Sequence, residues 1–308
     1  MPEPLVYLQG RLLKASEARL PYYDAGLVMG ATITELTRTF RGVPFRLEEH
    51  LARLLRGLAI ARIDAGLGTA ELAAIGRELV AHNATQISPS GDLALVFFVT
   101  AGELPVYAGL PGGKTPRHAS VCVHTFPLPF ESWAVAMTTG QHLVTPEIRH
   151  VPPECLDPAM KYRSRLHWFL ADQQARDADP AASALLLDLQ GNITETSAGN
   201  FFIVERGAIV SPTLRNILPG ESRKVVLELA EKLGIRASER DITPEQALTA
   251  AEAFTTSSSY CLLPVTRLNR QAICDGKPGP VYARLLAAYS ELVGLDIKRQ
   301  IVDEAAHP

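Results

Sequence analysis

The chain is organised around residues 155–203, which read CLDPAMKYRSRLHWFLADQQARDADPAASALLLDLQGNITETSAGNFFI. Lys161 precedes an expected helix, and Glu195 lies further on in a strand-turn-strand segment. A lysine that opens a helix beside Arg163 and Arg165 is a candidate Schiff-base nucleophile, because nearby cations and the helix N-terminus favour its neutral amine. Such a lysine is more often a solvated surface group, so the rest of the chain has to supply the partners of a catalytic one.

Composition places the chain among ordinary globular proteins of one large or two smaller domains. It has 308 residues, of which 47% are hydrophobic and 20% are charged. The formal net charge of −3 argues against a nucleic-acid groove and against a surface for anionic membranes. The apolar run at 93–99 is only strand-sized, and the first residues lack the basic and apolar regions of a signal peptide. We therefore expect a cytoplasmic protein that binds neither nucleic acid nor membrane.

The four cysteines indicate neither a metal site nor a disulfide framework. Cys122, Cys155, Cys261 and Cys274 show no CxxC spacing and no clustered histidines. We expect no bound metal, and thiols that stay reduced.

Strands and helices alternate in the first part of the chain. Hairpins are expected at 5–13, around Gly10, and at 32–47, around Arg41-Gly42. Leucines then recur at helical spacing and predict a helix over 48–61. The other expected elements are a helix at 70–83 and strands at 93–100 and 118–126.

The segment PLPFES at 127–132 is the expected linker, because it holds two prolines and no helical periodicity. The interspersed elements around it predict a mixed α/β (α+β) fold with a smaller domain at 1–128 and a larger one at 129–308. Beyond the linker we expect strands at 134–144, 183–188, 193–196 and 200–204, helices at 165–178, 222–233, 243–251 and 279–293, and a frayed tail at 302–308.

Three places carry groups suited to a phosphate. LPGESR at 218–223 opens an expected helix with free N–H groups, a glycine and a serine, although ordinary capping by Ser222 explains the same residues. The run TTSSS at 255–259 fits a phosphate site and equally fits a turn with local hydrogen bonds. Arg53 can clamp a phosphate, but an arginine beside a leucine stripe is more often a surface group.

Glu195, between two threonines of an expected strand, indicates a partly buried carboxylate that needs a cationic partner to stay charged. A pyridinium nitrogen meets that need, and so does an arginine. The chain contains no GxSxG elbow, P-loop or HExxH motif, so hydrolase, nucleotide and metal chemistry find no support.

Taken in this order, the segments resemble the class IV aminotransferases, the fold-type-IV enzymes that use pyridoxal 5′-phosphate (PLP). That family includes branched-chain and D-amino-acid aminotransferases and aminodeoxychorismate lyase. The resemblance runs from about Tyr7 to Leu295 and implies a two-domain fold. Its motifs are D-x-G…G…E from Asp24 to Glu35, FRLEEHLARL at 45–54, Lys161, ITETSAGNFFIV at 193–204, ILPGESRKVVLELA at 217–230 and TSSSYCLLPV at 256–265.

The resemblance implies a role for each matching residue. Lys161 forms the imine with the cofactor, Glu195 faces the ring nitrogen, and Leu218 lies against the ring. The remaining cofactor-binding residues that it implies, most of them at the phosphate, are Arg53, Ser197, Gly220, Glu221, Ser222, Ser258 and Ser259.

Three positions depart from the family pattern near the expected substrate. Ala101 stands where relatives carry the arginine of V-T-R-G, which anchors the substrate carboxylate. Thr34 replaces a phenylalanine or tyrosine, and Leu166 replaces an aromatic residue. We therefore expect Thr34, Arg163 and Arg165 to contact substrate, with the two arginines as a substitute carboxylate clamp.

The resemblance favours a PLP-dependent transaminase. It would move an amino group between an amino acid, branched-chain-like or of D configuration, and a 2-oxo acid, by a ping-pong mechanism through a Lys161 aldimine. The alternatives are a PLP-dependent lyase of the aminodeoxychorismate type and a non-catalytic PLP-binding protein. The resemblance also implies a homodimer, whose partners are a small-molecule amino donor and a 2-oxo acid acceptor.

Overall fold

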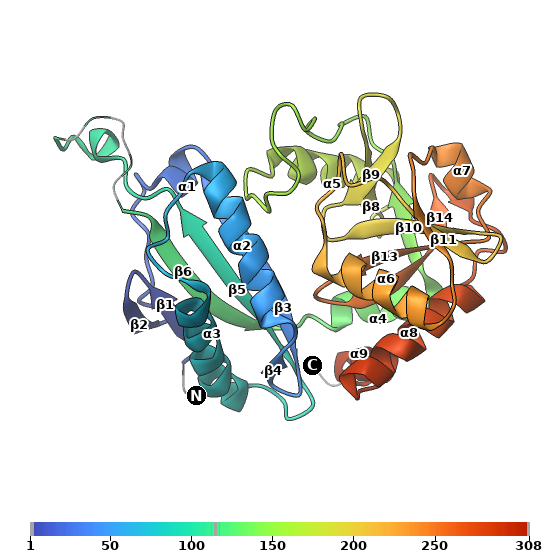
Figure 1. Ribbon diagram of the computed structural model, residues 1–308, viewed down its shortest axis with the longest axis horizontal. Helices are drawn as coiled ribbons and strands as arrows, with labels where there is room; N and C mark the ends of the chain where they lie inside the picture. Colours follow the sequence, from blue (N-terminus) through green and yellow to red (C-terminus); the bar gives the residue numbers. More distant parts are fainter. Residues whose placement is uncertain (1–2, 112, 114–115, 117, 307–308) are drawn as a thin grey trace. The chain divides into compact units, whose positions relative to one another are not determined.

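The computed structural model describes residues 3–111, 113, 116 and 118–306, which divide into two compact units (Figure 1). The first unit comprises Met1–Leu128 and Met160–Ser164, and the second comprises Pro129–Ala159 and Arg165–Pro308. The segment around Lys161 therefore belongs to the first unit, although the sequence placed it in the larger domain. Each unit has its own sheet and its own hydrophobic core.

The first unit is built on an antiparallel sheet. Among the described residues its strands follow the order β2-β1-β6-β5-β3-β4, with β3 and β5 paired over most of their length. The hairpin turns expected at Gly10 and at Arg41-Gly42 are present, but the strand after the second turn is only two residues long. The strands are β1 Leu5–Leu8, β2 Arg11–Lys14, β3 Thr32–Phe40, β4 Val43–Pro44, β5 Leu93–Thr100 and β6 Ser120–Pro127.

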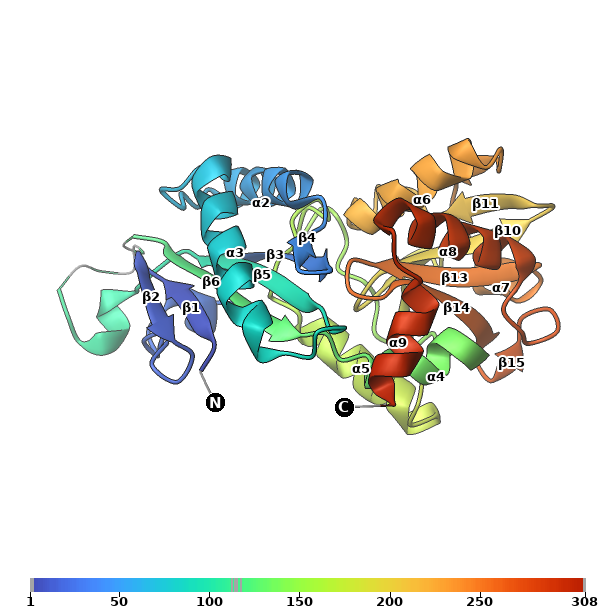
Figure 2. The same ribbon diagram turned by 90° about the horizontal axis from the view of Figure 1, so that it is seen from below.

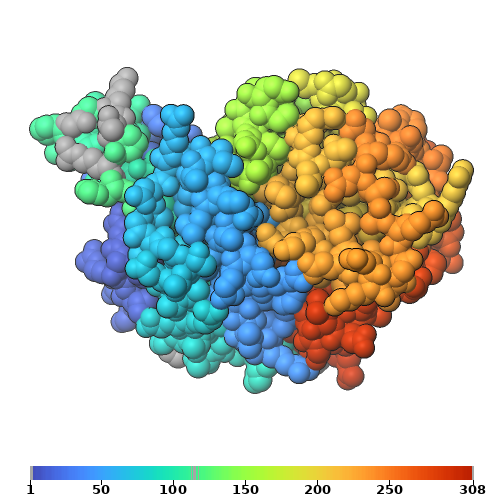
Figure 3. Space-filling model, viewed as in Figure 1, coloured from blue at the N-terminus to red at the C-terminus, as the bar shows by residue number. Residues whose placement is uncertain are grey.

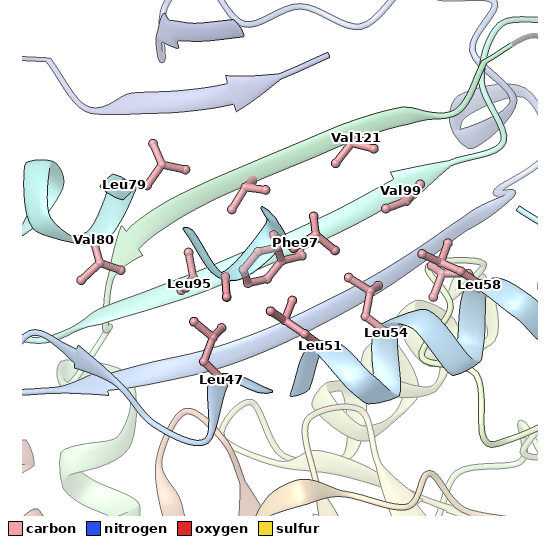
Figure 4. Close-up of a cluster of buried hydrophobic side chains, with 14 residues drawn as sticks. Leu47, Leu51, Leu54, Leu58, Leu79, Val80, Leu95, Phe97, Val99 and Val121 are labelled. Atoms are coloured by element: carbon pink, nitrogen blue, oxygen red, sulfur yellow. The ribbon is translucent and has the colours of Figure 1, made fainter. Parts of the chain in front are cut away.

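Helices α2 (Leu47–Ala61) and α3 (Thr69–Asn83) cover one face of this sheet (Figure 2). Leucines recur every three or four residues along α2, so one apolar stripe of the helix faces the strands. Figure 4 shows Leu47, Leu51 and Leu54 beside Phe97 of β5, all buried. This packing fixes α2 against β3. The unit also contains α1 Ala25–Val28 and the 3-10 turns Ala84–Gln86 and Pro105–Ala108.

The second unit is built on a closed ring of strands. The sheet order is β12-β11-β10-β13-β14-β7-β8-β9, and β9 also pairs with β10, so the run from β10 to β9 closes on itself. Closure leaves no free edge within the ring, and inward-facing apolar side chains fill its interior. The strands are β7 Gln141–Val144, β8 Ser183–Leu187, β9 Ile193–Thr196, β10 Asn200–Glu205, β11 Ala208–Ser211, β12 Ala237–Glu239, β13 Glu252–Ser257, β14 Cys261–Leu268 and β15 Gln271–Ala272.

Helices pack around this ring. Helix α6 lies against β13 and α8, and α5 lies against β8. Part of α6 is visible in orange on the surface of the second unit in Figure 3. The helices of this unit are α4 Glu131–Thr139, α5 Leu166–Ala178, α6 Glu221–Lys232, α7 Pro244–Leu248, α8 Pro280–Val293 and α9 Ile297–Ala305.

Two expectations about the second unit are wrong. The strand expected over 134–144 is helix α4 up to Thr139, and only 141–144 is strand. The short apolar segment reads equally well as strand or helix, and packing against α9 and β14 decides for helix. The tail expected to fray is helical to Ala305, because Asp296 caps α9 and Ile301 is buried. The last two residues of that tail, 307–308, lie outside the described residues.

Two further boundaries differ by a few residues. Helix α7 ends at Leu248 rather than near 251, in a segment that leads directly into β13. The hydroxyl run at 255–259 is not one turn, because β13 continues to Ser257 and buries Thr255 and Thr256.

Candidate active site

The lysine segment extends the first unit's sheet along the edge of β3. The Thr34 N–H donates to the Lys161 carbonyl at 2.8 Å, and the Arg163 N–H donates to the Thr32 carbonyl at 3.0 Å. An antiparallel bridge lies between these two hydrogen bonds. The backbone on both sides of Lys161 is thus fixed to a strand, which gives its half-buried side chain a rigid base.

The D-x-G…G…E motif supports the same segment. Gly30 has φ +68°, and a Cβ there would lie 2.8 Å from the Ser164 hydroxyl, which donates to the Gly30 carbonyl at 2.7 Å. Asp24 is buried and accepts hydrogen bonds from the Gly26 N–H at 2.7 Å and from the Thr100 hydroxyl at 2.9 Å. The motif therefore holds the start of β3 and the end of the lysine segment in place.

Glu35, the last residue of that motif, forms a buried ion pair with Arg53. The Arg53 Nε and Nη2 atoms donate to the two carboxylate oxygens, each at 2.7 Å, and His50 Nδ1 lies 3.1 Å from Oε1. Burial opposes ionisation of this carboxyl, but Arg53 and His50 outweigh it and hold the pKa of Glu35 well below its usual range. Arg53 is thus buried and engaged with Glu35, and its contact with a phosphate stays a prediction.

The three residues expected at the substrate have different surroundings. The buried Thr34 hydroxyl donates to the Phe97 carbonyl at 2.9 Å. Arg163 is exposed, and its guanidinium lies 5.2 Å from the centre of the Phe98 ring. Arg165 belongs to the other unit, where it donates to the Ser197 carbonyl. A joint carboxylate clamp of the two arginines therefore stays a prediction.

Glu195 is held in the second unit by two uncharged donors. Its Oε2 accepts from the Asn200 amide at 3.0 Å, and its Oε1 accepts from the Leu218 N–H at 3.1 Å. The Asn200 amide also donates to the Leu218 carbonyl at 2.9 Å, which ties the β9–β10 turn to the start of α6. The side chain is 12% exposed, so the expectation of a partly buried carboxylate agrees with the structure. These two donors orient the carboxylate without neutralising its charge.

The start of α6 is uncapped. Its N-cap is Gly220, which offers no side-chain hydrogen bond, so ordinary capping by Ser222 is not what the structure has. A Cβ at Gly220 would lie 2.1 Å from Asn200 Oδ1, so only glycine permits this approach. Ser222 is 5% exposed, and its hydroxyl has no hydrogen-bond partner among the described residues. Buried Glu221 precedes it, and the first N–H groups of the helix form the kind of end that attracts an anion.

The hydroxyl run at 255–259 divides into structural and available groups. The Thr255 hydroxyl donates to Gln141 and the Thr256 hydroxyl to the Cys261 carbonyl, each at 2.7 Å. Ser258 lies in the turn after β13, is half-buried, and makes no hydrogen bond to any residue that the structure describes. Ser259 follows it in the same turn. Ser258 is therefore the hydroxyl of this run best able to bind a ligand.

Two residues that support Glu195 were not among the expected site residues. Asn200 stands opposite Glu195 in the β9–β10 pairing, a position that the hairpin spacing could have indicated. His150 Nε2 lies 3.6 Å from Glu195 Oε1, and no motif in the sequence distinguishes this histidine. Its position depends on the segment that follows β7, which only the fold brings to β9.

Two further observations bear on the class of protein. Among the described residues, no three histidine, cysteine or carboxylate side chains group together as a metal site would require. None of the helices in that part of the chain has the length and apolarity needed to cross a membrane.

Comparison with known proteins gives a consistent result. The family model for amino-transferase class IV matches residues 32–268. The chain is 30% identical to a D-alanine aminotransferase of Bacillus licheniformis over 90% of this chain and 92% of the relative. It is 28% identical to a putative branched-chain-amino-acid aminotransferase of Methanocaldococcus jannaschii over 93% of this chain and 96% of that relative. The solved structure of a branched-chain aminotransferase of the archaeon Thermoproteus uzoniensis with norvaline matches with a TM-score of 0.83 and 25% identity, over 95% of this chain and 96% of that one.

These matches confirm the resemblance and the mixed α/β fold class. The named relatives are aminotransferases, so the matches favour transamination over the lyase and over the non-catalytic binding protein. They leave the roles of the individual site residues as predictions.

Proposed function

The chain belongs to the class IV aminotransferase family and is a transaminase, and on that premise we propose its substrates and the residues that serve them. The enzyme moves an amino group between an amino acid, branched-chain-like or of D configuration, and a 2-oxo acid in a ping-pong cycle. PLP, when bound, supplies the carbonyl that carries the amino group and a ring that withdraws electrons. The observation that carries this proposal is the Glu195 carboxylate, held by uncharged donors beside the uncapped start of α6.

The second unit fits the two ends of that cofactor. A phosphate dianion suits the first N–H groups of α6 and the hydroxyls of Ser222 and Ser258, which lack hydrogen-bond partners among the described residues. A protonated ring nitrogen suits Glu195, whose two hydrogen-bond donors, from Asn200 and Leu218, are both uncharged. A carboxylate at the ring nitrogen holds the proton there, and that proton makes the ring a better electron acceptor.

Lys161 is the proton carrier in this proposal. Its backbone is hydrogen-bonded to β3, so the amine at Nζ samples a small region around a fixed base. Nζ would hold the cofactor in the resting enzyme, and once free it would accept the proton that leaves the substrate Cα and later donate that proton again. Thr34 on the paired strand and exposed Arg163, two residues from the lysine, are the first-unit groups that we assign to the substrate.

The test compares Lys161→Ala with a matched control, Lys14→Ala, which removes an exposed lysine from β2. Wild type and the control should be yellow and should retain the cofactor covalently after reduction with sodium borohydride. Lys161→Ala should retain none after reduction. A borohydride-fixed cofactor in Lys161→Ala would reject the assignment of the lysine.

The substrate class follows from half-reactions of wild type against L-amino acids, D-amino acids and simple amines, read by cofactor absorbance. Branched-chain L-amino acids or small D-amino acids should bleach the yellow colour, and their 2-oxo acids should restore it. A protein that changes colour with none of them would contradict the proposed function.

We also propose that the enzyme is a homodimer in the cytoplasm, a proposal supported only by the family resemblance and by the composition. Sedimentation equilibrium should give a mass of twice 33.4 kDa. Fractionation of the source cells should place the activity in the soluble fraction. A fully active monomer would contradict the proposed dimer. Activity confined to another fraction would contradict the proposed cytoplasmic location.

A further inference from the structure

His150 approaches the Glu195 carboxylate within the second unit. Its Nε2 lies 3.6 Å from Glu195 Oε1, the same oxygen that accepts from the Leu218 N–H. The His150 side chain is 5% exposed, so little water competes for this approach. A buried titratable ring beside the proposed ring-nitrogen partner has no role in the function described above.

The orientation of the His150 ring is fixed on several sides. Its backbone N–H donates to the Leu187 carbonyl at 2.9 Å, and its Nδ1 lies 3.0 Å from the Val151 carbonyl. The ring also meets His167 and Trp168 of α5 edge to face, at centre distances of 5.9 and 5.5 Å. The ring therefore cannot turn Nε2 away from Glu195 without losing these contacts.

The hydrogen-bond chemistry of the ring decides what Nε2 presents to the carboxylate. A carbonyl oxygen only accepts, so Nδ1 carries a hydrogen in the contact with Val151. A hydrogen on Nε2 turns the approach to Glu195 Oε1 into an attraction, whereas a bare Nε2 lone pair would repel the carboxylate. The contact with Oε1 therefore requires that Nε2 act as a donor.

We propose that His150 is a positioning residue that acts through Glu195, by attracting Oε1 and so fixing the orientation of the carboxylate. This inference rests on the proposed function, because it assumes that Glu195 faces the cofactor ring. Asn200 and Leu218 orient the carboxylate by hydrogen bonds, and His150 adds a third contact at 3.6 Å. Loss of that contact should loosen the orientation of the carboxylate and so weaken its hydrogen bond to the ring nitrogen.

Two substitutions at His150 separate this role from simple packing. His150→Phe keeps an aromatic ring against His167 and Trp168 but removes Nε2, whereas His150→Gln loses the ring and keeps an N–H donor. Alanine is unsuitable because His150 lines a cavity of about 370 Å³, which truncation would extend toward Glu195. His142→Phe is the matched control, because His142 is a second buried histidine with a carboxylate partner, Asp179 at 2.7 Å.

The measurements are kcat and KM of the better substrate from the half-reaction panel and the visible spectrum of the bound cofactor. His150→Phe should lower kcat roughly tenfold with little change in KM, and His150→Gln should retain most of the rate. The spectrum of His150→Phe should shift in the same direction as that of Glu195→Gln. In the Glu195→Gln background, His150→Phe should have little further effect, since the two residues act as one unit.

The opposite ranking, with His150→Phe normal and His150→Gln impaired, would overturn the proposal in favour of packing. Equal losses of kcat in His150→Phe and His142→Phe would also overturn it, because a general loss of stability would then explain both. Full additivity with Glu195→Gln would show that His150 does not act through Glu195. Failure of the proposed function is seen separately, as a wild type that transaminates none of the substrates.

Discussion

Two glutamates of this chain show opposite ways of holding a buried carboxylate. Glu35 in the first unit is fully buried and meets the cation Arg53 through two hydrogen bonds of 2.7 Å. Glu195 in the second unit is slightly exposed and receives its two hydrogen bonds from uncharged donors. The charge of Glu35 is therefore compensated inside the protein, whereas most of the charge of Glu195 remains available to a ligand.

Because of this difference, we expect the loss of each carboxylate to destabilise the fold to a different extent. Removing one member of a buried ion pair leaves an uncompensated charge in the interior, which destabilises the fold strongly. Removing a carboxylate held by uncharged donors leaves only hydrogen-bonding groups to rearrange, which costs less stability. We therefore expect Glu35 to matter chiefly for folding and Glu195 chiefly for chemistry.

The largest expected effect is on stability. Glu35→Gln should lower the free energy of unfolding by about 3–5 kcal/mol, because Arg53 is left buried without its anion. Denaturant unfolding of the purified protein measures this change. Glu48→Gln is the control, since the exposed pair of Glu48 with Arg77 should contribute less than about 1 kcal/mol. Equal effects of the two substitutions would contradict the contrast between buried and exposed pairs.

The second prediction concerns turnover. Glu195→Gln should lower kcat by about a hundredfold, the loss typical of one electrostatic group at a reacting centre. The free energy of unfolding should change by less than about 1 kcal/mol, since glutamine can still accept one of the two hydrogen bonds. Steady-state kinetics and denaturant unfolding on the same preparation test both statements. Near-full turnover in this variant would exclude an electronic role for Glu195.

A smaller effect is expected at the turn that joins Glu195 to α6. In Gly220→Ala the new Cβ meets Asn200 Oδ1, so the Asn200 amide has to leave its position between Glu195 and Leu218. We expect cofactor affinity to fall roughly tenfold, the value of one hydrogen bond to a charged group. Equilibrium dialysis against PLP measures it. Gly68→Ala is the control, because a Cβ at this other helix N-cap meets only Glu71 Oε2 at 3.7 Å. An unchanged affinity for PLP in Gly220→Ala would show that this turn does not contribute to cofactor binding.

Periodicity predicted most of the fold because most elements bury one face. The leucine stripe of α2 and the apolar run of β5 each have one strong period, and the structure has both where the sequence placed them. The strand prediction for 134–139 was wrong because the small and apolar residues there show no clear periodicity. Contacts with α9 stabilise this segment as a helix. The parallel pairing of β7 with β14, which lies far along the chain, completes the ring and is a long-range pairing that local sequence does not encode.

The candidate site was predictable where its residues lie in continuous motifs. Glu195, Gly220 and Ser222 come from such segments, and the structure links the first two through Asn200. The partner of Arg53 was missed, although Glu35 ends the D-x-G…G…E motif, because a pair between β3 and α2 depends on which faces of the two elements meet. His150 was missed because it contacts Glu195 only after the chain has passed through β8 and returned in β9.

The smallest expected effect is on the pH dependence of stability, which differs between His167 in the second unit and Glu35 in the first. Burial lowers the pKa of His167 to about 4, with further lowering from His150 and Arg165. In the unfolded chain its pKa is about 6.5, so between about pH 6.5 and 4 the unfolded state binds the extra proton and stability falls as pH falls. Glu35 acts in a lower window, because its pKa is lowered on folding and its contribution is lost only below the unfolded value of about 4.3.

The pH dependence of thermal unfolding between pH 7 and 4.5 should therefore report His167 rather than the Glu35 pair. His167→Gln should flatten this dependence by less than about 1 kcal/mol, since the group is partly exposed and solvent screens it. His82→Gln, at an exposed position of α3, should leave the slope as in wild type. The contrary result is an unchanged slope in His167→Gln together with an altered slope in Glu35→Gln. The Glu35 carboxylate would then titrate at a higher pH than its contacts with Arg53 and His50 imply. The contrast between the two glutamates would be smaller than their geometry indicates.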